Sequence, residues 1–123
     1  MNLMKETHAF VKRLPADERF RLGDQMQRAS RSVPTNIAEG WGRRTSPREF
    51  KRFLTIAMAS ANEMEVHYKV SRDLGFGHEP DCQRLITECE IEAKQIRTLI
   101  ARWHARTTPP SSLHPPALNE GEA

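Results

Sequence analysis

The sequence predicts an all-α fold, an antiparallel up-down-up-down four-helix bundle over residues 1–106. Apolar residues recur three and four positions apart through most of this range, which is the period of an amphipathic helix. Proline and glycine interrupt the pattern at a few places, where short turns would join consecutive helices. The composition, with 37% hydrophobic, 28% charged and 7% aromatic residues, is typical of a helical bundle. Such a bundle could bury the rest of its apolar surface against partner subunits.

The first predicted helix spans residues 2–14, where apolar side chains recur at helical spacing. Pro15 ends this helix because its ring clashes with a continuing helical backbone, and the same proline suits the first position of the second helix. The second helix covers residues 15–40 with one apolar stripe. Pro34 lies inside that stripe, so the helix either kinks there or a new helix begins, and the unbroken phase favours a kink. A turn over residues 40–45 should follow.

The third helix has the clearest start in the chain. Ser46 is the expected N-cap, Pro47 the first helical residue, and Glu49 the partner that completes a capping box. Gly75 is expected in the left-handed conformation that ends this helix. The fourth helix should begin near Pro80 and complete the bundle.

The last segment, residues 107–123, is rich in proline and poor in apolar residues, which predicts a disordered or weakly docked tail. No apolar run reaches the roughly 18 residues of a membrane span, and the N-terminus lacks the layout of a signal peptide. A cytoplasmic protein is therefore expected. Cys82 and Cys89 are expected to be reduced thiols in the core, since their spacing on a helix holds them too far apart for a disulfide.

The basic residues concentrate in the N-terminal half of the chain. The whole chain carries a net charge of +3, yet residues 1–52 hold 12 Lys and Arg against 6 Asp and Glu. Such an asymmetry is typical of proteins with a polyanionic partner, although a solvated basic surface has the same composition.

Catalytic, cofactor and metal sites find little support in the sequence. Gly40-Trp41-Gly42 lacks the preceding strand and the spacing of a phosphate-binding loop. Glu63 and His67 are four residues apart, and no second copy of the pair exists for a di-iron site. No serine lies in a nucleophile elbow. We therefore expect no enzyme activity, no metal and no cofactor.

The strongest functional candidates are basic residues on both sides of the predicted turn. Guanidinium groups match phosphate oxygens, so such a cluster could bind a nucleic-acid backbone without reading its sequence. The alternative is a solubilising surface in which arginines pair with Glu39 or with a neighbouring subunit. The candidate residues are Arg28, Arg31, Arg43, Arg44, Arg48, Lys51 and Arg52. Trp41, beside them, could stack on a base, but a core or subunit contact is favoured.

Two motifs give the chain a family resemblance. The pattern R-A-x-x-S-x-x-x-N-I-A-E-G-x-x-R begins at Arg28 and ends at Arg43, and E-F-x-R-F-L-x-I-A-x-x-S runs from Glu49 to Ser60. The chain thereby resembles the four-helix-bundle family of proteins encoded in intervening sequences of bacterial large-subunit ribosomal RNA genes. It is also similar to the accessory protein of diversity-generating retroelements, a basic pentamer that binds nucleic acid and a reverse transcriptase.

The resemblance implies a homopentameric ring and nucleic-acid binding by the basic residues. It also implies a structural role for Asn36, Glu39 and Gly40 at the end of the second helix. The resulting hypothesis is a non-enzymatic oligomeric scaffold that binds the backbone of RNA or DNA. The alternative is a protein–protein interaction module that binds no nucleic acid.

Overall fold

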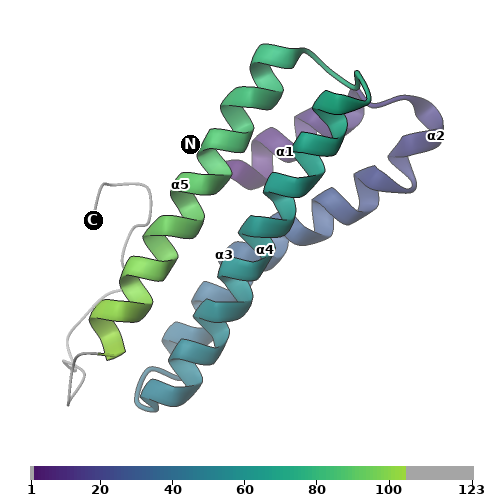
Figure 1. Ribbon diagram of the computed structural model, residues 1–123. Helices are drawn as coiled ribbons and strands as arrows, with labels where there is room; N and C mark the ends of the chain where they lie inside the picture. Colours follow the sequence, from purple (N-terminus) through teal and green to yellow (C-terminus); the bar gives the residue numbers. More distant parts are fainter. Residues whose placement is uncertain (1, 105–123) are drawn as a thin grey trace.

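The structure, a computed structural model, describes residues 2–104 and is all-α over that range (Figure 1). The helices are α1 (Leu3–Lys12), α2 (Ala16–Arg19), α3 (Leu22–Gly42), α4 (Pro47–Asp73) and α5 (Glu79–His104). Four of them are long enough to be bundle helices, and α2 is a single turn of four residues. The all-α fold is confirmed, whereas the predicted tail at residues 107–123 lies outside the described residues.

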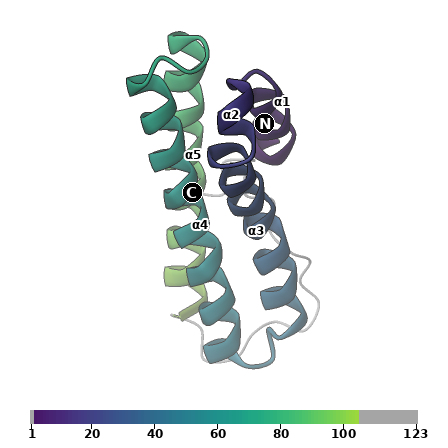
Figure 2. The same cartoon turned by 90° about the vertical axis from the view of Figure 1, so that its right-hand side faces the viewer.

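The three longest helices, α3, α4 and α5, lie side by side, and consecutive ones run in opposite directions (Figures 1 and 2). The middle helix, α4, packs against both α3 and α5. The short α1 lies with α2 at the end of the bundle where α4 passes into α5 (Figure 2). Since α1 has 10 residues and α4 has 27, the fourth helix of the bundle covers only part of its length.

The core forms two clusters along the bundle. The first joins α1 to the other helices, and the second lies where α3 passes into α4. The first contains Leu3, Phe10, Val11, Leu14, Met26, Ala29, Met64, Tyr68, Cys82, Leu85, Ile86 and Cys89. The second contains Val33, Phe50, Leu54, Ala57, Ala61, Ala93, Ile96 and Trp103.

The predicted second helix is wrong at its start. Pro15 is the N-cap of α2 rather than a helical residue, and the chain leaves helical geometry at Arg21, with φ −109° and ψ −85°, before α3 begins. None of the residues of α2 is buried, so no core contact holds this turn in line with α3. Just after the break, Gly23 lies so close to α1 that an added Cβ would stand 2.8 Å from a methyl group of Val11.

The helix itself continues across Pro34, so the alternative of a new helix at this proline is wrong. Gly40, expected in the turn, is instead a buried residue of α3. The end of α4 agrees with the sequence, since Gly75 has φ +75°. No helix within residues 2–104 is both long and apolar enough to cross a membrane.

Candidate nucleic-acid interface

Ser46 forms the hydrogen bonds that end the turn between α3 and α4 and begin α4. Its hydroxyl accepts the backbone N–H of Glu49 at 3.3 Å, and its carbonyl accepts that of Phe50 at 3.0 Å, so it caps α4 as predicted. The reciprocal half of the capping box is absent, because the Ser46 N–H donates to the carbonyl of Arg43 at 3.0 Å. The Glu49 side chain is thereby left to bind arginines.

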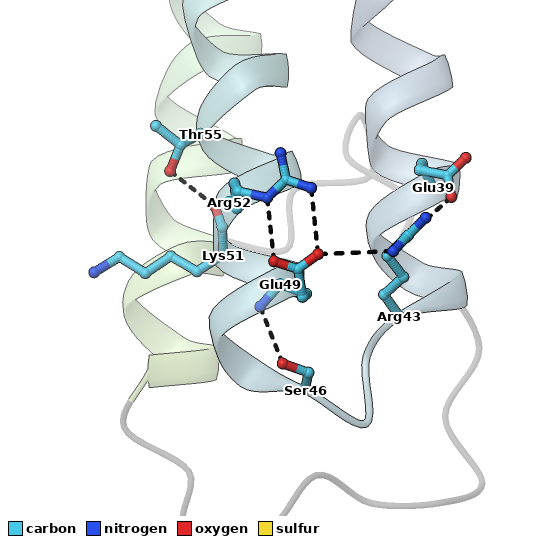
Figure 3. A network of polar contacts seen from close by, with 7 residues as sticks. All are labelled: Glu39, Arg43, Ser46, Glu49, Lys51, Arg52 and Thr55. Carbon is cyan, nitrogen blue, oxygen red and sulfur yellow. Dashed lines mark hydrogen bonds and ion pairs between the residues drawn. The ribbon is translucent and has the colours of Figure 1, made fainter.

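Glu49 joins an arginine from each helix (Figure 3). Its carboxylate accepts two hydrogen bonds of 3.2 Å from Arg52, and Arg43 Nη1 lies 3.7 Å from one of the same two oxygens. Arg43 Nε also donates to Glu39 at 3.2 Å. The hydrogen bonds from Arg52, followed by the positive charges of Arg52 and Arg43, lower the pKa of Glu49 below its ordinary value. Arg43 and Arg52 are therefore paired with two carboxylates, those of Glu39 and Glu49.

Phe53 contacts both of these arginines. The guanidinium of Arg52 lies 4.4 Å from the centre of the Phe53 ring, and that of Arg43 lies 5.3 Å from it. A cation over an aromatic face is attracted to the electrons of the ring and is held in one orientation. Both guanidinium groups are thus fixed by a carboxylate and a ring, although their side chains stay about half exposed, at 51% and 54%.

Arg44 is held by Trp41 rather than by an acid. Its guanidinium lies 4.5 Å from the centre of the indole, and Nη1 donates to the Trp41 carbonyl at 3.1 Å. The indole also meets the rings of Phe50 and Trp103 edge to face, with each pair of ring centres 6.1 Å apart. Trp41 thus covers the second core cluster, which is the contact favoured from the sequence.

Arg48 and Lys51 lie on another side of α4. Both are exposed, and Figure 3 shows Lys51 pointing away from Glu49 and Arg52. Together they line a groove of about 380 Å³ whose floor is formed by Leu54, Ile100 and Trp103. Within residues 2–104, neither side chain forms an ion pair with a carboxylate. Like Arg44, these two cations are therefore not paired with a carboxylate at this end of the bundle.

Arg28 and Arg31 do not belong to the same cluster. They lie in the first half of α3, and 12 residues separate Arg31 from Arg43, roughly 18 Å along a helix. The sequence predicts that all seven basic residues form one surface. The structure divides them between the α3–α4 end and the first half of α3.

The signature residues join α3 to α4. Asn36 Nδ2 donates to the carbonyl and the hydroxyl of Ser32, at 2.8 and 2.9 Å, and the Ser60 hydroxyl of α4 donates to that of Ser32 at 2.8 Å. At Gly40, an added Cβ would meet Phe53 Cβ at 3.0 Å and a ring carbon of Phe50 at 3.1 Å. A hydrogen-bond network and a close approach of the two helices thus explain this part of the pattern.

Comparison with known families adds the decisive observation. The model of the 23S rRNA-intervening sequence protein family matches residues 1–98, most of the chain. The chain belongs to this family. No curated protein matches the sequence.

For this 23S rRNA-intervening sequence protein, two features of the interface were missed in the sequence. One is that Glu49 contacts both Arg52 and Arg43. Six residues and a turn separate Glu49 from Arg43, and this sequence spacing does not tell how far apart the two side chains lie. The other is the hydrogen bond between Ser32 and Ser60, although the first motif contains Ser32 and the second contains Ser60.

Across residues 2–104, no three His, Cys, Asp or Glu side chains form a group that could hold a metal ion. The pair formed by Glu63 and His67 is 3.0 Å apart.

Proposed function

We propose that this protein is a cytoplasmic, non-enzymatic oligomeric scaffold that binds the backbone of RNA or DNA through the α3–α4 end of the bundle. One observation carries the proposal. Arg44, Arg48 and Lys51 gather at this end, and none of them forms an ion pair with a carboxylate in the described part of the chain. Phosphate oxygens would supply the missing negative charge.

This mode of binding reads no sequence. Contacts from Arg and Lys to phosphates fix the register of a protein on nucleic acid, whereas sequence is read at the edges of the bases. Trp41 is packed on Phe50 and Trp103 and so is occupied by the core. Salt-sensitive and sequence-tolerant binding is the expected behaviour.

The direct test is the double variant Arg48→Gln/Lys51→Gln, with anisotropy of labelled RNA and DNA measured at two salt concentrations. We expect weaker binding and a salt slope smaller by about 1.4 to 1.8, which corresponds to two lost phosphate contacts. The matched control is Lys94→Gln/Arg97→Gln, which removes two exposed charges at the same spacing on α5. Wild-type protein that binds no RNA or DNA at low salt would contradict the proposal.

The oligomer is proposed to be the ring of five that the family resemblance implies. An apolar stripe along α4 and its C-cap supports this proposal, because Ile56, Val66, Val70 and Leu74 are 38%, 56%, 38% and 61% exposed. Native mass spectrometry of Val66→Glu/Val70→Glu should show a smaller assembly than wild type. The control is Ile91→Glu, which places one such charge at an apolar residue of α5 that is 44% exposed.

The same apolar stripe favours the second candidate function, a protein–protein interaction module without nucleic acid. In that case Arg48 and Lys51 would be a solubilising rim. The two functions differ in one measurement, because only the first predicts that salt weakens the binding of RNA or DNA.

A further inference from the structure

The part of α3 far from the α3–α4 turn carries a second basic surface. Phe20 is the C-cap residue of α2, just before α3, and 81% of its surface is exposed. It lines a shallow groove of about 610 Å³ together with Arg21, Arg28 and Arg31. The remaining lining residues are Asp24 and two glutamines.

The charges of this groove are uncompensated. Arg21, Arg28 and Arg31 are exposed, and none of them forms an ion pair with any carboxylate of residues 2–104. Asp24 is the single acid in the lining, so three cations face one anion. By contrast, Arg43 and Arg52 at the other end are matched by Glu39 and Glu49. A polyanion would therefore find more unpaired positive charge along α3 than at that pair.

The three arginines lie along one groove. Arg28 and Arg31 are three residues apart and so share a side of α3, and Arg21, the N-cap residue of that helix, lines the same groove. An exposed aromatic ring beside a row of cations is the arrangement by which proteins hold single-stranded nucleic acid. The cations follow the phosphates, and the ring stacks on an unpaired base. A duplex offers no free base face, so the ring selects single strands.

We propose that the Phe20 groove is a binding site for single-stranded nucleic acid, with Phe20 stacking on a base and Arg28 and Arg31 contacting consecutive phosphates. The site rests on the proposed nucleic-acid function but is separate from the α3–α4 end. It adds a preference for single strands that phosphate contacts alone do not provide.

The ring is tested with three probes, labelled oligo(dT), oligo(rU) and a DNA duplex of mixed sequence. Phe20→Leu keeps an apolar side chain without a ring face and should weaken binding of the single strands by roughly 5- to 100-fold. Phe20→Trp should restore it. Duplex binding should change little in either variant. Because Phe20 is exposed, neither substitution disturbs the core.

The arginines are tested by Arg28→Gln/Arg31→Gln, against the control Lys94→Gln/Arg97→Gln with the same spacing. We expect the salt slope for oligo(dT) to fall by about 1.4, since each lost phosphate contact on a single strand removes about 0.7. The control should leave the slope near that of wild type.

The outcomes separate the two proposals. If wild type binds no nucleic acid at any salt, the proposed function fails and this site fails with it. If wild type binds but Phe20→Leu and Arg28→Gln/Arg31→Gln behave like the control, the groove is overturned while the proposed function stands. A change in assembly mass on Phe20→Leu, with unchanged binding, would also overturn it and assign the groove to a subunit contact.

Discussion

The hydroxyl oxygens of Thr7 and Tyr68 lie 2.7 Å apart in the core and form a hydrogen bond between α1 and α4. Both residues have no exposed surface, and the ring of Phe10 meets that of Tyr68 edge to face at 5.0 Å. Burial raises the pKa of Tyr68 far above its ordinary value, so the phenol stays neutral. This bond fixes the short α1 on a bundle that it only partly covers.

Replacing Tyr68 with Phe should therefore lower the free energy of unfolding by about 1–3 kcal/mol, since the Thr7 hydroxyl is left buried without this partner. Urea denaturation followed by circular dichroism measures the change. The double variant Thr7→Val/Tyr68→Phe removes both polar groups at nearly constant shape and should be closer to wild type than Tyr68→Phe. If the double variant loses as much unfolding free energy as Thr7→Val and Tyr68→Phe lose in sum, the two hydroxyl groups do not stabilise the fold through their hydrogen bond.

The sequence was most informative where one local signal decides the structure. Ser46 and Pro47 specify a helix start, and Gly75 a left-handed end, because capping and φ depend on a few adjacent atoms. The break at Arg21 could not be found in this way. It lies beside the close contact of Gly23 with α1, and the apolar period of α3 does not report where another helix lies.

The candidate interface was predicted in its residue types but not in its geometry. Arginines do lie on both sides of the α3–α4 turn, as predicted. Which carboxylate each of them binds depends on distances across the turn. Glu49 was assigned to a capping box and instead accepts Arg52, while Arg31 was grouped with Arg43 and lies far along the same helix. Charge balance of a surface depends on such pairings, which residue counts do not contain.

Gly40 and Gly42 are predicted to respond in opposite directions to alanine. An added Cβ at Gly40 would press on Phe53 Cβ at 3.0 Å, and that atom moves only with the backbone of α4. We expect Gly40→Ala to lower the free energy of unfolding by about 1–3 kcal/mol. Gly42→Ala meets no described atom within 4 Å and should raise it by up to about 1 kcal/mol through helix propensity. Equal effects in urea denaturation would contradict the close approach.

The ion pair between Glu6 and Arg84 is predicted to make stability depend on pH. Two hydrogen bonds of 3.0 Å from Arg84 lower the pKa of Glu6 below its ordinary value of 4.5. The folded state therefore favours the ionised carboxylate, so the contribution is present above the unfolded pKa and is lost as pH falls through the lower folded pKa.

The expected result is a difference in unfolding free energy between wild type and Glu6→Gln that is under about 1 kcal/mol at neutral pH, because both side chains are partly exposed. The difference should shrink as the pH falls to about 3. Repeating the pair of measurements in an Arg84→Gln background should leave a smaller difference at neutral pH. If the difference between wild type and Glu6→Gln grew as the pH fell, the pKa of Glu6 could not be lowered in the folded state.

The last prediction concerns the acid between the two arginines at the α3–α4 turn. Glu49→Gln removes the carboxylate that holds Arg52 by two hydrogen bonds and Arg43 by a weaker contact. If phosphate binds at this end, the guanidinium of Arg52 becomes available to it, while Arg43 keeps its hydrogen bond to Glu39. We expect tighter binding of RNA or DNA at low salt and a salt slope steeper by up to about 0.9. Anisotropy titrations over a series of salt concentrations measure both quantities.

The matched control is Glu90→Gln, which also adds one net positive charge but lies on an exposed position of α5. It should raise affinity slightly, through long-range attraction, without a comparable change of slope. A general charge effect would make the two variants alike, whereas release of Arg52 separates them. Weaker binding by Glu49→Gln than by wild type would instead mean that Glu49 holds the arginines in the orientation that phosphate requires, and the idea that it competes with phosphate would be abandoned.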